Sequence, residues 1–98
     1  MSAVVWSPIA ERELDDLLYY IARVDRRPAT GERIYFEIKE LAESYARADA
    51  ARHKYSDAPD GWFYFQHKRW LVFYQLRPGG IEVMRVVDGS RDLPAVLP

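Results

Sequence analysis

The spacing of the apolar residues changes once along this chain, at about Gly61, from a helical period to the pattern of strands. Before that point, two stretches place apolar residues three and four positions apart. After it, aromatic and β-branched residues form short runs bounded by Gly and Pro. This combination predicts an α+β fold. The 98 residues, 49% of them hydrophobic, suffice for a single domain over residues 1–98.

Two amphipathic helices are expected in the first half of the chain. Ser7 is a good N-cap and Pro8 suits the first helical position, so the first helix should cover residues 8–23. Pro28 disfavours helix in the residue before it, and a second helix should cover residues 28–47. The buried stripes are expected to be Ala10, Leu14, Leu17, Leu18 and Ile21, followed by Ile34, Ile38, Leu41, Ala42 and Tyr45. A short connection makes the pair an antiparallel hairpin.

Strands are expected at both ends of this helical pair. The sequence predicts a first strand at residues 3–6, a loop over 48–61, and three later strands at 62–66, 70–76 and 81–87. The three later strands can form a meander, which the first strand joins as an added strand. The predicted order is β-α-α-β-β-β, a two-layer domain with the helical hairpin on one face of a small, mainly antiparallel sheet. The other face is expected to be polar and available to a partner.

The charge and composition exclude several classes of protein. The net charge is −1, with a balance of −3 over residues 1–61 and +2 over residues 62–98, which disfavours tight direct binding of nucleic acid. There are no cysteines, no apolar stretch long enough for a signal or a membrane span, and no cofactor motif. His53 and His67 lack metal-binding spacing and are expected to be solvated. A cytoplasmic protein with neither metal nor cofactor is expected.

Three segments resemble the ParE/RelE family of bacterial toxins. Residues 6–22 are similar to the family's first strand and helix and read WSPIAERELDDLLYYIA; residues 70–74 are similar to its central strand and read WLVFY. Residues 80–93, which read GIEVMRVVDGSRDL, are similar to its last strand and the turn beyond. The resemblance covers nearly the whole chain except residues 48–60. It implies the two-layer fold described above and a toxin that a ParD-like antitoxin, encoded beside it, holds inactive in a hetero-oligomer.

The resemblance implies one of two activities. ParE-like members poison DNA gyrase, whereas RelE-like members cut mRNA on the ribosome without a metal. Metal-free cleavage needs a base, an acid and cations, which RelE-like toxins supply from a basic cluster and a His or Tyr near the C-terminus. Here the tail after Asp92 contains no Tyr, His or Lys. Asp88 stands where many members of both kinds carry His, and its negative charge would repel a phosphate. Gyrase poisoning, with no catalytic residues of its own, is therefore the favoured interpretation.

The ribosome-dependent RNase remains the alternative. Its catalytic cations would be Arg85, Arg91, Lys68 and Arg69. By strand position, Arg85 could face either the core edge or the open face of the sheet. Arg85, Arg91 and Asp92 could instead form a surface ion pair that ties the tail to the sheet, with Leu93, Val96 and Leu97 as apolar anchors. Contacts with the target or the tail are expected from Arg85, Asp88, Arg91, Asp92 and Leu93.

Aromatic residues outside the apolar stripes predict the antitoxin surface. Tyr19 lies about 140° from Leu14 around the first helix, and Phe36 about 200° from Ile34 around the second, at ~100° per residue. Aromatic side chains displayed away from a core often anchor protein interfaces, although they could also pack on the tail or the loop. Antitoxin contacts are expected from Tyr19, Tyr20, Tyr35 and Phe36.

Two further classes of protein stay open at this point. The chain could be an inactive family member that acts only as a co-repressor with its antitoxin, or an unrelated α+β binding module. Expression of the chain alone in a bacterial host separates a toxin from a co-repressor, because folded protein without a growth defect indicates the co-repressor.

Overall fold

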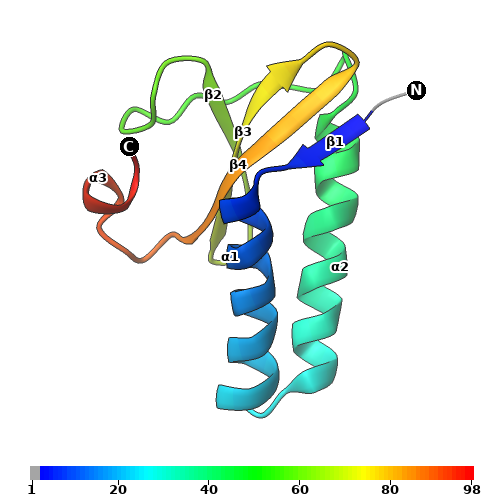
Figure 1. The fold of residues 1–98 in the computed structure, drawn as a ribbon, viewed down its shortest axis with the longest axis vertical. Helices are drawn as coiled ribbons and strands as arrows, with labels where there is room; N and C mark the ends of the chain where they lie inside the picture. The colour runs from blue at the N-terminus through cyan, green and yellow to red at the C-terminus, as the bar shows by residue number, and fades with distance from the viewer. Residues whose placement is uncertain (1–2) are drawn as a thin grey trace.

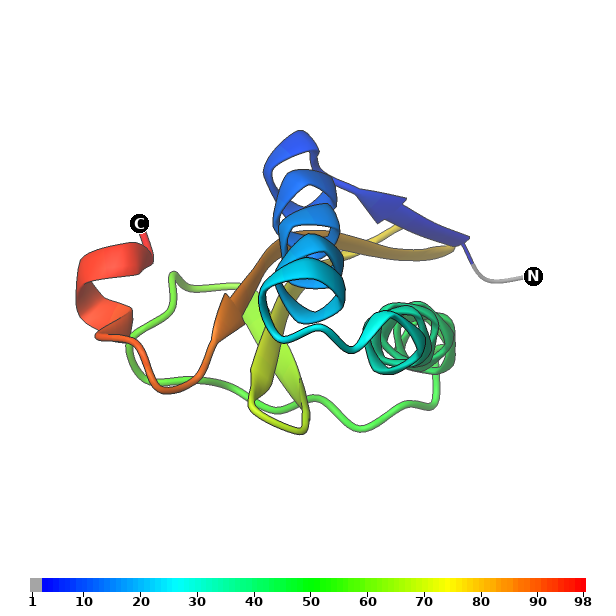
Figure 2. The same cartoon turned by 90° about the horizontal axis from the view of Figure 1, so that it is seen from below.

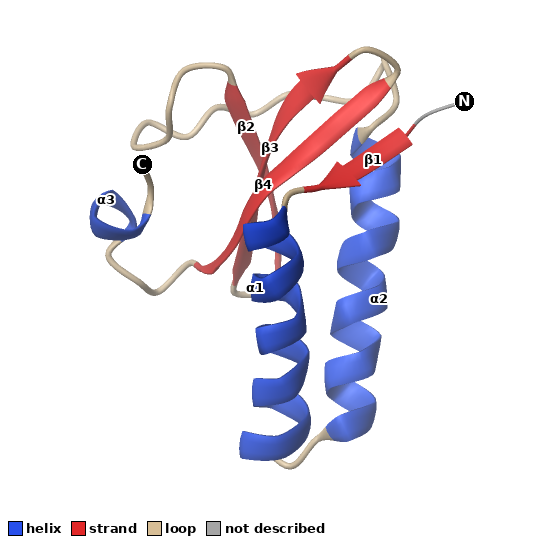
Figure 3. Ribbon diagram, in the orientation of Figure 1, coloured by secondary structure: helices blue, strands red, loops and turns tan. Residues whose placement is uncertain are grey.

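Two antiparallel helices lie against one face of a four-stranded sheet in the computed structural model, which describes residues 3–98 (Figure 1). In chain order the elements are β1 (Ala3–Trp6), α1 (Pro8–Tyr19), the π-helix η1 (Tyr20–Val24), α2 (Pro28–Tyr45), β2 (Trp62–His67), β3 (Trp70–Arg77), β4 (Gly80–Asp88) and α3 (Leu93–Val96). The α+β fold and the predicted order of helices and strands are confirmed (Figure 3). The π-helix and the short C-terminal helix were not predicted.

The first helix begins as its sequence predicts. The hydroxyl of Ser7 accepts a hydrogen bond from the backbone N–H of Ala10 at 3.1 Å, and Pro8 occupies the first turn. The same hydroxyl donates to the carbonyl of Met84 in β4 at 3.1 Å. Ser7 therefore both caps α1 and fixes its start against the sheet.

The sheet has the strand order β1-β4-β3-β2, in which β1 runs parallel to β4 and the other neighbours are antiparallel. The first strand, which was predicted to join the sheet as an added strand, thus lies at its edge. In the β3–β4 ladder, Phe73 pairs with Arg85 whereas Tyr74 pairs with Val83, so Met84 forms a β-bulge without a partner. The extra residue shifts the alternation of side chains along β4 by one position.

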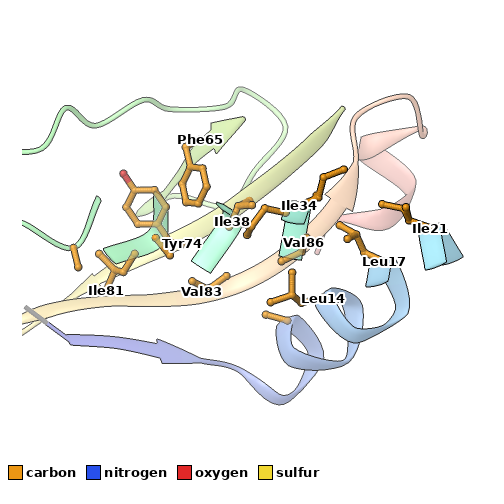
Figure 4. Close-up of a cluster of buried hydrophobic side chains, with 14 residues drawn as sticks. Leu14, Leu17, Ile21, Ile34, Ile38, Phe65, Tyr74, Ile81, Val83 and Val86 are labelled. Carbon is orange, nitrogen blue, oxygen red and sulfur yellow. The ribbon is translucent and has the colours of Figure 1, made fainter. Parts of the chain in front are cut away.

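The main core lies between the helical hairpin and the sheet. Figure 4 shows side chains from both helices and from β2, β3 and β4 meeting there. Gly31 in α2 is buried, and a Cβ at this position would lie 3.2 Å from the carbonyl oxygen of Leu18. Glycine at this position therefore lets the two helices approach closely.

The second face of the sheet is neither open nor polar, and that expectation was wrong. Leu71, Phe73 and Val87 on this face form a second apolar cluster with Leu93 and Leu97 of the C-terminal tail. The loop between α2 and β2 adds side chains to the same cluster, and Figure 2 shows this loop running from the end of α2 round to the side of the sheet on which α3 lies. The predicted anchors Leu93, Val96 and Leu97 do pack here, so the tail covers apolar strand residues that would otherwise contact water.

Both helices end slightly differently from the prediction. The α-helical part of the first helix stops at Tyr19, and one π-helical turn continues to Val24. The second helix stops at Tyr45, two residues before its predicted end. Single π-helical turns are uncommon and are frequent at functional sites, which draws attention to the end of α1.

Candidate functional site

Arg85 is held by two parts of the fold at the edge of β4. Its Nε and Nη2 donate to the two carboxylate oxygens of Glu13 in α1 at 3.0 and 2.8 Å, and its Nη1 donates to the carbonyl of Val96 at 2.7 Å. The side chains of Arg85 and Glu13 are only 17% and 21% exposed. The hydrogen bond to Glu13 raises the pKa of Arg85 above its ordinary value. One guanidinium thus connects α1, β4 and the C-terminal tail.

Glu13 has a second role that explains its position. β1 is short and pairs with β4 only as far as Val83, so the edge of β4 beyond this residue has no strand partner. The carboxylate of Glu13 accepts the N–H of Val86 on that edge at 2.9 Å. Sequence reasoning missed Glu13, although it lies about 60° from Ala10 and 40° from Leu17 at the border of the apolar stripe, where a carboxylate is unexpected.

Arg69 and Asp88 form another ion pair, between the β2–β3 turn and the end of β4. The Nε of Arg69 donates to Asp88 Oδ2 at 2.9 Å, and Ser90 donates to Oδ1 through its N–H and its hydroxyl. Partial burial alone would raise the pKa of Asp88, but the hydrogen bonds from Arg69 and Ser90 outweigh it and hold that pKa below its usual value. The guanidinium of Arg69 also lies 5.0 Å from the ring centre of Trp70.

The tip of the helical hairpin and the β2–β3 turn border two adjoining open hollows. The larger, of about 410 Å³, extends from Tyr20 to Asp88 and Arg91; the smaller, of about 170 Å³, extends to Asp25, Arg27 and Lys68. Tyr20, Arg69 and Trp70 line both of them. We call this region the hairpin-tip surface and define it by Tyr20, Lys68, Arg69, Trp70 and Arg91. It brings together four predicted site residues, Tyr20, Lys68, Arg69 and Arg91, with Trp70, which was predicted only as part of a strand.

The backbone next to the hairpin-tip surface is unusual. Arg26, in the turn between the helices, and Lys68, in the β2–β3 turn, have φ values of 56° and 54°. Within residues 3–98, these are the non-glycine residues in the left-handed region, which costs of order 1–2 kcal/mol per residue. Both lie at the same end of the molecule as the π-helical turn. Such strain tends to cluster at functional sites.

The four aromatic residues predicted to bind the antitoxin lie in three different environments. Tyr19 and Phe36 point outward and are 63% and 61% exposed, so neither is covered by the tail or the loop. Tyr20 lies in the hairpin-tip surface. Tyr35 is half-buried against the core, where its ring meets that of Phe36 edge-on at 5.2 Å and lies under the ammonium of Lys39.

The five residues predicted to contact the target or the tail also differ in their surroundings. Arg85 contacts the tail, and Leu93 is part of the tail and packs against the sheet. The carboxylate partner of Arg85 is Glu13 rather than Asp92, which corrects the surface pair suggested by the sequence. Asp88 is paired with Arg69. Arg91 and Asp92 are exposed and form no ion pair within residues 3–98.

The two histidines differ from each other. His53 is exposed, as expected. His67 is 19% exposed and its Nε2 lies 2.8 Å from Glu37 Oε1 in α2, so the expectation that it is solvated was wrong. Hydrogen bonding to His67 lowers the pKa of Glu37. This contact joins α2 to the β2–β3 turn.

Two properties of residues 3–98 complete the description. No helix in this range has both the length and the apolar character needed to cross a membrane. The same range contains no group of three metal-ligating His, Cys, Asp or Glu side chains.

The chain is similar to known toxins in sequence and in fold. Residues 4–93 match the family described as the ParE toxin of the type II toxin–antitoxin system parDE. No match was found among the curated proteins. A solved structure titled "Chromosomal ParDE TA system from P. aeruginosa" contains a chain that superposes with a TM-score of 0.71 at 14% identity, covering 90% of this chain and 96% of that chain. At this identity the structural likeness concerns the fold alone, which it confirms.

Proposed function

Because this chain belongs to the ParE family of type II toxins, we propose that it acts in the cytoplasm as a poison of DNA gyrase and that a ParD-like antitoxin neutralises it in a hetero-oligomer. The observation that carries this proposal is the family match over residues 4–93, which includes α1, α2, β2, β3, β4 and all of β1 except Ala3.

Two ion pairs favour this activity over ribosome-dependent mRNA cleavage. Of the four cations that cleavage would use, Arg85 is neutralised by Glu13 and Arg69 by Asp88. A phosphate at either guanidinium would have to compete with a carboxylate that is already hydrogen-bonded there. Within residues 3–98, Lys68 and Arg91 form no such pair, which leaves a weak basis for stabilising the charge of a phosphorane.

We assign the contact with gyrase to the hairpin-tip surface. It combines the aromatic side chains of Tyr20 and Trp70 with the cations Lys68 and Arg91 around two adjoining open hollows. Aromatic residues and arginine are the types most enriched at the centres of protein interfaces. The strained backbone at Arg26 and Lys68 supports the same assignment.

The purified protein is expected to inhibit supercoiling by DNA gyrase and to cause cleaved DNA to accumulate in the same reaction. Arg91→Glu reverses an exposed charge of the hairpin-tip surface, so this variant should need about tenfold more protein for the same inhibition. Both quantities are measured on agarose gels with a titration of the toxin.

Lys54→Glu is the matched control, since Lys54 is exposed and lies in the loop before β2, outside the hairpin-tip surface. Unimpaired supercoiling at a large molar excess of the wild-type protein would contradict the proposal. Cleavage of mRNA on translating ribosomes would then identify the RNase alternative. Folded protein without any growth defect in a bacterial host would identify the co-repressor.

Replacing Tyr19 or Phe36 by glutamate is expected to weaken antitoxin binding. Each ring is exposed and its loss from an interface core typically costs about 2 kcal/mol, a roughly 30-fold higher Kd. The affinity is measured by isothermal titration calorimetry with the polypeptide encoded beside the toxin. Val24→Glu serves as the control, because Val24 is 57% exposed but is not among the predicted contacts. Equal affinities for all three variants and the wild type would remove Tyr19 and Phe36 from the antitoxin surface.

A further inference from the structure

A cleft of about 730 Å³ lies at the end of the molecule opposite to the hairpin-tip surface, between the C-terminal end of α2 and the β3–β4 turn. In Figure 1 these two segments lie next to each other at the top of the molecule. Its lining includes three arginines, Arg47, Arg52 and Arg77, and the apolar residues Ala48, Ala50 and Leu76. We call it the arginine cleft. The proposed gyrase contact does not involve any of these residues.

The apolar part of the arginine cleft follows from the lengths of two elements. Tyr74 and Leu76 lie on the same face of β3 because side chains alternate along a strand. Tyr74 is fully buried beneath the end of α2, whereas Leu76 lies beyond the last helical residue, Tyr45, and remains 50% exposed. A leucine on the helical face of the sheet is thus left without a covering helix.

Arg52 has a fixed position in the arginine cleft. Its Nη2 donates to the carbonyl of Arg47 at 2.8 Å, and its Nη1 donates to the carbonyl of Tyr45, at the C-terminal end of α2. The guanidinium also lies over the ring of Tyr74, 5.8 Å from its centre. A cation at this end of a helix is stabilised by the helix dipole. All these partners are uncharged, so the positive charge of Arg52 is not neutralised by a carboxylate among residues 3–98.

The other two arginines leave the arginine cleft positively charged. Arg47 is exposed and forms no ion pair in the part of the chain that the structure describes. Arg77 pairs with Glu82 at 2.7 Å. Asp49 lies in the same loop, but its side chain is not part of the lining. Three cations against one paired carboxylate give a local charge of +2, in a protein whose net charge is −1.

We propose that the arginine cleft binds an acidic segment of the antitoxin, with an aliphatic or aromatic side chain against Leu76 and a carboxylate paired with Arg47. The identity of the partner rests on the proposed function. Charge complementarity selects a carboxylate-bearing peptide, and the exposed Leu76 adds an apolar contact that a nucleic acid backbone does not use. Duplex DNA requires a row of cations along its phosphates, which three arginines around one hollow do not supply.

The test is the affinity of the polypeptide encoded beside the toxin for the full-length wild-type protein and for Arg47→Glu, measured by titration calorimetry at several salt concentrations. Arg47→Glu should raise the Kd about tenfold at low salt and flatten its salt dependence. Leu76→Ser should also raise the Kd, and it should leave the salt dependence unchanged. Lys54→Glu, the same change of charge elsewhere in the loop, should shift the Kd less than about twofold.

The outcomes separate this proposal from the proposed function. Tight binding to the wild type with an unchanged Kd for Arg47→Glu and Leu76→Ser would overturn the arginine cleft alone. Absence of any binding to the wild type would overturn both. Binding of a fluorescent DNA duplex, measured by fluorescence anisotropy, provides the remaining comparison. If Arg47→Glu weakens binding of the duplex but leaves the affinity for the antitoxin unchanged, the ligand of the arginine cleft is a nucleic acid and not a peptide.

Discussion

Replacing Arg85 by alanine is expected to lower the free energy of unfolding by about 3 kcal/mol, a large share of the ~5–15 kcal/mol typical of small domains. The substitution leaves the carboxylate of Glu13 mostly buried without its countercharge, and it also removes the hydrogen bond to the carbonyl of Val96. Urea unfolding followed by circular dichroism measures the change.

Two further variants test the cause of this loss. Arg91→Ala removes an arginine that is exposed and unpaired within residues 3–98, and should change the stability by less than about 0.5 kcal/mol. Arg85→Lys keeps the charge but not the two parallel hydrogen bonds, so its stability should lie between those of Arg85→Ala and the wild type. If Arg85→Ala lowered the free energy of unfolding by less than about 1 kcal/mol, water would hydrate Glu13 as well as the guanidinium binds it, and the proposed cause would be wrong.

Replacing Gly80 by alanine is expected to destabilise the protein by about 3 kcal/mol or to detach β1 from the sheet. Gly80 pairs with Ala3 across the parallel ladder, and a Cβ here would lie 2.7 Å from the carbonyl carbon of Ala3 and closer still to its oxygen. These are backbone atoms, so no rotation of a side chain can relieve the contact. Urea unfolding and hydrogen exchange of the β1 amides distinguish a general loss of stability from local detachment.

The neighbouring Gly79 provides a matched control. Its φ is 79°, and a Cβ at this position meets no atom within 4 Å. Gly79→Ala should therefore cost about 1 kcal/mol through backbone strain alone. Equal losses for Gly79→Ala and Gly80→Ala would show that the close approach of β1 is not the cause.

Local chemistry made most of the secondary structure predictable. Ser7 and Pro8 specify a helix start through hydrogen bonding and a fixed φ, and Pro28 does so for the second helix. The period of the apolar residues separates helices from strands because each periodicity places them on one face. The anchors Leu93 and Leu97 were also predictable, since apolar side chains in a tail are stabilised by packing away from water.

The candidate sites depended on contacts that no local pattern contains. Glu13 and Arg85 are 72 residues apart, and their pairing requires both the short β1, which leaves the edge of β4 free, and the bulge at Met84. The sequence predicted an open, polar face of the sheet because it could not show that the tail and the loop fold back over Phe73 and Val87.

The sequence by itself determined the order of the main elements and most residues of the apolar stripes, because these depend on local propensity and periodicity. Its resemblance to known toxins indicated the family. Only the tertiary structure decided which charges are neutralised and which are free. It paired Arg85 with Glu13 and Arg69 with Asp88, and it left Arg47 unpaired within residues 3–98 beside the exposed Leu76. The physical reason is that ion pairing and solvent exposure depend on distances of a few ångströms between segments far apart in the chain.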